Sequence, residues 1–517
     1  YELFAGRKVG RDGHLRLARA EMTRLTTLEA SLPNGALAWR GGEALRDMAR
    51  RLASVSEIPA VPVPKGLKAT LRHYQEEGLS WLQFLAALGL SGVLADDMGL
   101  GKTVQALAHI LAEKEAGRLT RPCLIVGPTS LVPTWRNEAR KFAPDLKVLV
   151  LHGNERRELF DEIEHHDIVL TSYALLLRDK DLLLGHHYRM VILDEAQAIK
   201  NPATKLARTA CQLRADHRVA LSGTPIENHL GELWSVFHFL MPGFLGDRET
   251  FRRVFRNQIE KEGDSARQQL LATRVRPFLL RRTKEQVAAE LPPKQEMVRE
   301  IEISEGQRDL YESVRLSMHK RVREEIEQRG LARSNIAILE ALLKLRQVCC
   351  DPRLLKSKGP GPVPSAKFEL LMDMLPGMIE TGRHVIIFSQ FVEMLDLIDD
   401  ALTEAQIPFV KLTGQTKDRE TPVRRFQDGE VQVFLISLKA GGTGLTLTRA
   451  DTVIHYDPWW NPAVEAQATD RAHRIGQDKT VFVYKLIAEG TVEEKMVELQ
   501  AKKQALVDGV LSGTAAG

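Results

Sequence analysis

The sequence predicts an α/β protein with two doubly wound lobes, each built on a parallel sheet. Short runs rich in Val and Ile alternate with segments of helical periodicity, which is typical of buried parallel strands in βα units. These runs form two groups, the first ending at 218–223 and the second opening at 384–389. The chain has 517 residues, more than one hydrophobic core usually serves. Two lobes are therefore expected rather than one.

Each group contains several candidate strands. The first group comprises 92–95, 123–127, 147–153, 167–172, 190–195 and 218–223. The second comprises 384–389, 409–414, 431–437, 452–457 and 480–486.

Pro-rich and Gly-rich stretches at 57–66 and 356–365 indicate boundaries, and charged helical sequence dominates 286–350. The chain opens without Met, so we expect a segment of a longer protein. The predicted regions are an N-terminal accessory region at 1–60, a first lobe at 61–285, a helical insertion and linker at 286–355, a second lobe at 356–495, and a C-terminal helix at 496–517 that packs back on the lobes.

Composition narrows the function only slightly. Hydrophobic residues make up 44% and charged residues 27%, as in an ordinary soluble protein. No apolar run approaches the roughly 18 residues that span a bilayer, so no membrane partner is expected. Four cysteines without a CxxC pair indicate a reducing compartment and no zinc site. The net charge of +4 permits nucleic-acid binding without requiring it.

A phosphate-binding loop is predicted in "GVLADDMGLGKTVQALAHIL", residues 92–111. A short strand leads into a loop in which Gly99 and Gly101 allow backbone N–H groups to approach phosphates. Lys102 would neutralise phosphate charge, and Thr103 would bind Mg²⁺. Asp96 stands where the strict pattern has Gly, so a simple glycine turn opening a helix is the alternative.

An acidic pair that could complete an ATP site ends the strand in "MVILDEAQ". Asp194 would hold Mg²⁺ and Glu195 would position and deprotonate the attacking water. Adjacent carboxylates also occur as helix caps. The GKT sequence upstream favours an ATP site over this alternative.

Two arginines in "QATDRAHRIGQ", Arg471 and Arg474, are three residues apart. Positions i and i+3 share a helix face, and a guanidinium suits phosphate oxygens. The plainer alternative is a solvated basic face.

Taken in order, "DDMGLGKT", "DEAQAIKN", "LSGTPIEN", "FSQF", "KAGGTGLTLT" and "QATDRAHRIGQ" resemble motifs I to VI of the Swi/Snf family. These are superfamily-two helicase-type ATPases with two RecA-like lobes, which translocate on double-stranded DNA. The resemblance runs from about residue 65 to about 505, and is closest in wording to bacterial members.

The resemblance implies ATP and Mg²⁺ as cofactors and assigns roles by position. Arg471 and Arg474 would be arginine fingers that reach the γ-phosphate, with Lys102 and Glu195 completing the catalytic set. Gln75 would read the adenine edge. The ATP-binding set is Gln75, Asp97, Met98, Gly99, Leu100, Gly101, Lys102 and Thr103. Residues that would couple phosphate state to lobe movement are Gln197, Ser222, Thr224 and Gly444.

Contacts to the duplex are also implied by resemblance, and they would fall on the backbone with little sequence specificity. Trp460 would lie near the DNA backbone, although a Trp pair is more often core. The remaining residues of this set are Thr129, Thr171, Ser172, Ser389, Gln390, Lys439 and Gly441.

Two positions depart from the family. Gln197 stands where many relatives carry His, and we expect it to bridge the cleft by hydrogen bonds so that activity survives. Thr446 stands where the family usually has Asn, which could weaken coupling at the lobe interface.

The predicted function is a DNA-stimulated ATPase that moves on duplex DNA, without strand separation, and displaces bound protein. RNA polymerase or nucleoid proteins are the expected targets, in a cytoplasmic, nucleoid-associated monomer. The alternatives are a strand-separating DNA or RNA helicase and, in another class, a catalytically silent DNA-binding scaffold.

Overall fold

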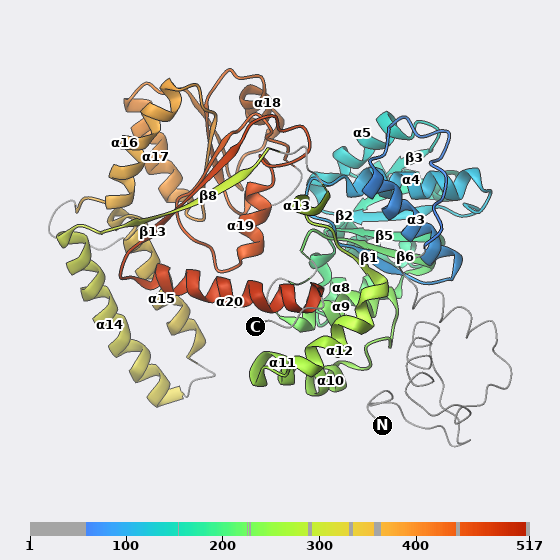
Figure 1. The fold of residues 1–517 in the computed structure, drawn as a ribbon, viewed down its shortest axis with the longest axis horizontal. Helices are drawn as coiled ribbons and strands as arrows, with labels where there is room; N and C mark the ends of the chain where they lie inside the picture. The colour runs from blue at the N-terminus through green and yellow to red at the C-terminus, as the bar shows by residue number, and fades with distance from the viewer. Residues whose placement is uncertain are drawn as a thin grey trace. The chain divides into compact units, whose positions relative to one another are not determined.

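The computed structural model describes residues 58–512, apart from 154, 225, 227–228, 288–291, 330–333, 356–362 and 441–444. The accessory region expected at 1–60 therefore lies almost entirely outside the described residues. The chain divides into two compact units: the first comprises the residues up to Val287 together with those from Ala505 onward, and the second covers the residues between them, up to Gln504. Each unit has its own parallel sheet (Figure 1). Among the described helices, none is long and apolar enough to span a membrane.

The sheet of the first unit has the strand order β3-β4-β2-β5-β6-β1-β7, and every neighbouring pair is parallel. Its strands are β1 (Gly92–Leu94), β2 (Cys123–Gly127), β3 (Val148–Val150), β4 (Ile168–Ser172), β5 (His187–Asp194), β6 (Arg214–Leu221) and β7 (Leu279–Leu280). The central strands are apolar and buried because helices cover both faces of such a sheet.

The helices of the first unit alternate with these strands. They are α3 (His73–Ala87), α4 (Lys102–Glu115), α5 (Val132–Phe142), α6 (Tyr173–Arg178), α7 (Lys180–Leu183), α8 (Lys205–Gln212), α9 (Leu230–Leu240), α10 (Arg248–Phe251), α11 (Asn257–Glu262), α12 (Ser265–Val275) and α13 (Lys284–Val287). Short 3₁₀ turns include η4 (Thr129–Leu131) and η6 (Ala196–Ile199), and η7 (Arg252–Arg256) is a π-helical turn.

The second unit has a parallel sheet of strand order β10-β11-β9-β12-β13-β8. Its strands are β8 (Lys294–Ile301), β9 (Val385–Ser389), β10 (Phe409–Leu412), β11 (Val433–Ser437), β12 (Thr452–His455) and β13 (Val481–Ala488). Its helices are α14 (Glu305–Arg329), α15 (Asn335–Cys350), α16 (Ala366–Glu380), α17 (Val392–Glu404), α18 (Glu420–Gln427), α19 (Pro462–Thr469) and α20 (Val492–Ser512).

Strand β9 shows how the second sheet builds a core on each face. Val385 and Ile387 pack into one apolar cluster, whereas Ile386 and Phe388 pack into another. Successive side chains of a strand point to opposite faces, so a continuous apolar run fills both layers. This is why the Val/Ile-rich runs were informative.

Every strand predicted from an apolar run is confirmed, but β7 and β8 are not predicted. Most side chains of β8 are exposed, and it pairs only with β13 at the sheet edge. Its sequence, "KQEMVREI", is charged, because an edge strand needs no apolar run. The charged segment 286–350 therefore contains a strand, β8, before its two long helices α14 and α15.

A buried ion pair joins three elements of the second unit. Lys367 on α16 donates to Glu493 Oε2 at 2.6 Å, and also to the carbonyl oxygens of Tyr456 and Leu486 at 3.2 and 2.8 Å. Both charged side chains are almost fully buried. Burial is the main cause that raises the pKa of Glu493, and the Lys367 ammonium opposes it. A buried charge of this kind depends on its partner.

Lys367→Met should lower the free energy of unfolding by about 3 kcal/mol, since it leaves the Glu493 carboxylate buried without a cation. Urea unfolding, followed by a spectroscopic signal from the second unit, measures this free energy. Lys495→Met is the control, because the Lys495–Glu498 pair on α20 is exposed and should cost less than about 1 kcal/mol. Adding Glu493→Gln to Lys367→Met should recover part of the loss; equal stability of Lys367→Met and the control would contradict the assignment.

Candidate nucleotide site and nucleic-acid interface

The strand order of the first sheet brings three motifs to one edge. Strands β1, β6 and β5 are parallel neighbours, so the segments that follow them leave the sheet side by side. The loop at 95–101 follows β1, Ser222 follows β6, and Asp194 ends β5. Crevices outside the carboxyl ends of parallel strands are where such folds bind ligands.

The loop after β1 has the backbone expected of a phosphate cradle. Gly99 and Gly101 have φ values of 88° and 79°, which glycine adopts at little cost. Gly101 caps α4, and Lys102 is the first residue of that helix. The Lys102 ammonium donates to the carbonyl oxygens of Asp96 and Asp97 at 2.7 and 3.3 Å. Its charge therefore already lies over the loop where a phosphate would bind.

Asp96, which replaces the usual glycine, is held by a buried network. Arg282 donates from Nε to Asp96 Oδ1 at 2.9 Å and from Nη2 to Oδ2 at 2.5 Å. Gln105 on α4 also donates to Oδ2, at 3.2 Å, and Arg282 donates to the carbonyl oxygen of Tyr74. The departure from the strict pattern thus ties the loop to α3, to α4 and to the segment after β7.

Sequence analysis did not identify Arg282. A carboxylate at a glycine position was the available signal, because a buried carboxylate needs a cation, but the partner lies 186 residues away. The neighbouring Asp97 is also tied to this segment: its N–H donates to the Arg282 carbonyl at 3.0 Å, and its Oδ2 accepts from Lys284 N at 3.1 Å.

Gln75 lies beside the phosphate loop rather than on the surface. Its side chain is buried, with Nε2 donating to the Leu100 carbonyl at 3.1 Å and Oε1 accepting from Arg72 N at 3.0 Å. A Cβ placed on Gly101 would lie only 2.5 Å from Gln75 Nε2. The amide thus supports the loop in this conformation, and its contact with adenine stays a prediction. Met98 and Thr103 are half-buried in the loop and in the first turn of α4.

Asp194 is buried at the end of β5 and accepts two hydrogen bonds. Trp135 Nε1 donates to Oδ2 at 2.8 Å, and the Glu195 N–H donates to Oδ1 at 2.9 Å. Burial and then the Glu195 charge raise the pKa of Asp194 to about 7, while Trp135 and the Lys102 charge oppose the rise. The site therefore holds a carboxylate whose ionised form gains from additional positive charge.

Glu195 has φ 50° and ψ 56°, in the left-handed region. Such backbone strain in a residue other than glycine costs free energy and often accompanies function. Gln197 Nε2 donates to Glu195 Oε2 at 2.8 Å, and Gln197 Oε1 accepts from Ser222 Oγ at 3.0 Å. Ser222 Oγ also accepts from Thr224 N at 3.1 Å. Gln197 therefore links Glu195 to the segment after β6 within the first unit, and a bridge across the cleft stays a prediction.

Residues of this edge fit a magnesium nucleotide. The Asp194 carboxylate keeps lone pairs beyond the two that it uses, and Thr103 supplies a hydroxyl near the loop. Mg²⁺ prefers oxygen ligands and shares them with substrate phosphates. In the part of the chain that the structure describes, no group of three or more His, Cys, Asp and Glu forms a separate metal site.

Arg471 and Arg474 belong to the second unit and follow α19. That helix ends at Thr469, so the prediction of one helix face shared by both arginines is wrong. Gln477 Nε2 donates to the carbonyl oxygens of Ala450 and Ala472 at 2.8 and 2.9 Å. One of these bonds is local and the other is long-range, and both lie in the series of turns that follows α19.

The two arginines have different surroundings. Arg471 is only 1% exposed, and its carbonyl accepts from Leu447 N at 3.0 Å. Arg474 is half-buried and its Nη1 donates to Thr446 Oγ1 at 2.9 Å. Thr446, the residue that departs from the family pattern, therefore contacts a candidate finger. Their approach to a γ-phosphate stays a prediction.

The residues expected to contact DNA follow neighbouring strands in both sheets. In the first unit, Thr129 is exposed after β2, whereas Thr171 and Ser172 are buried at the end of β4. Ser172 Oγ caps α6 by accepting from Leu175 N. Buried hydroxyls support the local fold in this conformation, and their contact with a phosphate stays a prediction.

In the second unit, strands β11, β9 and β12 are neighbours. Ser389 is buried, with Oγ donating to Asp457 Oδ1 at 2.5 Å, whereas Lys439 is exposed. A cavity of about 390 Å³ gathers three residues of the expected DNA set from separate segments: Gln390, Lys439 and Trp460. Gly441 and Gly444 lie outside the described residues.

Arg346 on α15 lies beside this cavity and was missed in the sequence. Its guanidinium carbon is 5.4 Å from the Trp460 ring centre and 5.7 Å from that of Trp459, and Nη2 donates to the Pro458 carbonyl at 2.9 Å. It fixes the tryptophan pair by cation–π contact. The backbone N–H of Trp459 also donates to the Glu465 carboxylate, consistent with packing.

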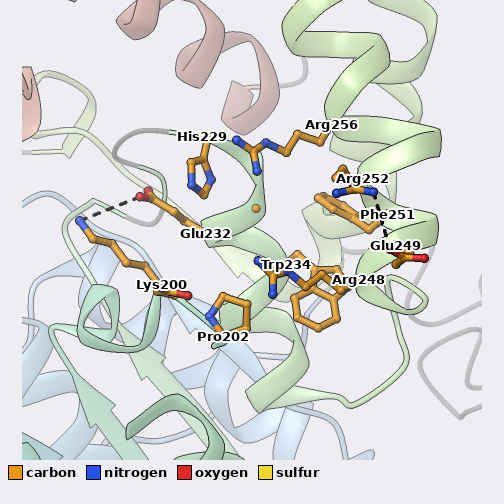
Figure 2. Close-up of a pocket in the computed structure, with 12 residues that line it drawn as sticks. Lys200, Pro202, His229, Glu232, Trp234, Arg248, Glu249, Phe251, Arg252 and Arg256 are labelled. Atoms are coloured by element: carbon orange, nitrogen blue, oxygen red, sulfur yellow. Dashed lines mark ion pairs between the residues drawn. The ribbon is translucent and has the colours of Figure 1, made fainter. Parts of the chain in front are cut away.

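A larger cavity of about 640 Å³ lies in the first unit around α9, α10 and η7. Figure 2 shows its charged lining, in which Lys200 faces Glu232 and Arg252 faces Glu249. Arg256 is likewise paired, with Glu260. Arg248 also lines this cavity, and the pairing of the other three cations with carboxylates distinguishes its lining from the loop after β1.

A glycine-bearing loop, an acidic pair and Ser222 follow adjacent strands of a parallel sheet, an arrangement typical of a RecA-like lobe, and a second parallel α/β unit follows it in the chain. Comparison with known proteins identifies the family within this class. Residues 74–354 match the SNF2-related domain, and residues 366–476 match the helicase conserved C-terminal domain. The chain belongs to the SNF2-related (Swi2/Snf2) ATPase family, which confirms the resemblance in the sequence.

Several relatives are similar over most of the chain. A candidate ATP-dependent helicase/translocase of Bacillus subtilis (strain 168), YwqA, is 42% identical over 90% of this chain and 51% of its own length. An uncharacterised ATP-dependent helicase of Mycoplasma pneumoniae is 41% identical over 86% of this chain and 42% of its own length. The chain thus spans about half the length of these relatives.

A solved Sulfolobus solfataricus SWI2/SNF2 ATPase core, in complex with double-stranded DNA, is 37% identical over 88% of this chain and 96% of its own, with a TM-score of 0.46.

Arg282→Met should weaken binding of a fluorescent ATP analogue by about tenfold or more, because the buried Asp96 carboxylate loses its cation and the loop loses its support. Fluorescence titration at fixed Mg²⁺ measures this. Arg121→Met is the control, since it removes an arginine from an exposed pair with Asp216 in the same unit. Equal affinities of the two variants would argue against a supporting role for Arg282.

Proposed function

We propose that the chain is the motor of an ATP-driven translocase that moves on double-stranded DNA and displaces bound protein without separating the strands. One observation carries the proposal: Lys102, Asp194 and Ser222 meet at the carboxyl edge of adjacent parallel strands. This edge offers a cation for phosphate, a carboxylate for Mg²⁺ and a network around Glu195. Those are the parts that phosphoryl transfer to water requires.

The roles follow from charge and position. Lys102 would bind the β- and γ-phosphates, and Asp194 with Thr103 would hold Mg²⁺. Glu195, held by Gln197 at 2.8 Å, would orient and deprotonate the attacking water. Gln197 and Ser222 would carry the loss of the γ-phosphate to the segment after β6. Family membership supports this assignment.

Arg471 and Arg474 would supply positive charge to the transferred phosphoryl group, an effect worth about 10³–10⁵ in rate. Because they belong to the second unit, hydrolysis would depend on closure of the two units around ATP. ATP would then favour a closed state and its products an open one, which makes a two-state motor.

Duplex DNA is the proposed track. Exposed Thr129 and Lys439 and half-buried Trp460 follow strand ends, and Arg346 adds a cation beside the tryptophan pair. Such side chains would contact the phosphate backbone of the DNA, so binding would be weakly sequence-specific and sensitive to salt. Bound proteins such as RNA polymerase or nucleoid proteins are the proposed targets, in a monomeric, nucleoid-associated protein.

The steady-state ATPase rate with no nucleic acid, duplex DNA, single-stranded DNA and RNA at fixed salt tests the proposal. Duplex should stimulate most, and Lys102→Ala should abolish turnover because the phosphates lose their cation. A forked duplex measured in parallel should stay annealed. Robust unwinding would favour the strand-separating helicase instead, and no hydrolysis under any condition would favour a silent scaffold.

Thr446→Val should lower kcat by about threefold with little change in KM, because Arg474 loses the hydroxyl that accepts its 2.9 Å hydrogen bond. Thr446→Asn keeps an acceptor and should retain most of the rate. Steady-state kinetics with saturating duplex measures both variants. A Thr446→Val enzyme with unchanged kcat would show that this contact does not position Arg474 for turnover.

A further inference from the structure

Two aromatic side chains from different segments converge on Asp194. Trp135 Nε1 donates to the carboxylate oxygen Oδ2 at 2.8 Å, and the Tyr173 hydroxyl donates to the backbone carbonyl of the same residue at 2.7 Å. Trp135 is 2% exposed and Tyr173 is 8% exposed. One aromatic residue thus orients the carboxylate, and the other fixes the main chain that bears it.

These aromatic residues come from the segments expected to face DNA. Trp135 lies in the first two turns of α5, shortly after Thr129 in η4. Tyr173 opens α6 directly after Ser172. Strand β2 lies between β4 and β5 in the sheet, so the segment after β2 leaves the sheet beside the end of the strand that carries Asp194, and the segment after β4 leaves it one strand further away.

We propose that Trp135 and Tyr173 are positioning residues that hold Asp194 from the segments after β2 and β4, so that contact of these segments with a duplex alters how well Asp194 holds Mg²⁺. The duplex part rests on the proposed function, whereas the positioning part does not. A shift of either segment moves a hydrogen-bond donor that is aimed at Asp194. Stimulation by DNA can therefore act within the first unit, before any arginine arrives from the second.

The geometry makes the relay direct. A rigid indole buried in the core connects the start of α5, which directly follows η4, to Asp194 Oδ2 without an intervening flexible side chain. Partners that orient a metal-binding residue usually change metal affinity or activity by about 10–100-fold when they are removed. The indole N–H is the group to remove, because Phe keeps most of the ring volume and loses only the donor.

The first measurement needs no turnover. Binding of a fluorescent non-hydrolysable ATP analogue is titrated with Mg²⁺ for the full chain and for Trp135→Phe and Tyr173→Phe. We expect Trp135→Phe to need about tenfold more Mg²⁺ for half-maximal binding and Tyr173→Phe to need severalfold more. Without Mg²⁺, the affinity of both variants for the same analogue should differ from that of the unaltered protein by less than about twofold. A general loss of structure would instead weaken binding both with and without Mg²⁺.

Matched controls exist in the same unit. Trp234→Phe removes an indole donor to the Gly246 carbonyl at 3.0 Å, and Tyr188→Phe removes a hydroxyl donor to the Leu183 carbonyl at 3.0 Å. Both control residues are buried, and neither hydrogen bond involves Asp194. We expect both controls to keep the Mg²⁺ dependence of the unaltered protein. Test variants that match their controls would overturn the proposal.

The second measurement addresses the duplex. At the Mg²⁺ concentration that gives half-maximal nucleotide binding for each variant, Trp135→Phe should lower the stimulation of ATPase by duplex about tenfold, while the duplex concentration for half-maximal effect changes less than about twofold. Unchanged stimulation beside a shifted Mg²⁺ dependence would overturn the relay to DNA. If the unaltered protein itself shows no stimulation by duplex, the proposed function fails, and the nucleotide-binding measurement still decides whether Trp135 and Tyr173 position Asp194.

Discussion

In an all-parallel sheet every strand ends at the same edge, and this constraint gathers the functional segments of the chain. The order β4-β2-β5-β6-β1 places five strand ends in a row in the first unit. Tyr173, Trp135, Asp194, Ser222 and Lys102 follow or lie near these ends, although they are far apart in the sequence. The phosphate loop stays in this row because the Asp96–Arg282 pair ties it to the neighbouring segment after β7.

Two departures from the family pattern become intelligible in this setting. The Gln197 amide donates to Glu195 through its nitrogen and accepts from Ser222 through its oxygen. One side chain therefore bridges these two residues. Thr446 gives Arg474 a hydroxyl acceptor. In both cases the residue that is present makes a hydrogen bond to a neighbouring polar side chain, so neither departure leaves its position without a polar contact.

Much of the fold and of the candidate site could be predicted from the sequence where the determining residues are close together in the chain. Runs such as "CLIVG" show buried strands because both faces of a parallel sheet are covered, and the glycines of the phosphate loop show its backbone. Strand β8 could not be predicted, because pairing with β13 rather than its own apolar content makes it a strand. Arg282 and Trp135 act across 186 and 59 residues of sequence, and their partners are determined by the fold. Helix α19 ends at Thr469, and the turns after it are joined to the distant Ala450 carbonyl by Gln477, a contact that local sequence does not reveal.

The edges of both sheets have a further consequence. In the first unit the outer strands β3 and β7 have only three and two residues. In the second unit β8 carries Lys294 and Glu296, which pair with each other at 2.8 Å, and β10 carries Lys411 paired with Asp396 and Asp399. Brevity and fixed charge both discourage another chain from adding a strand. A chain built on two open sheets is thereby protected against aggregation through its own backbone.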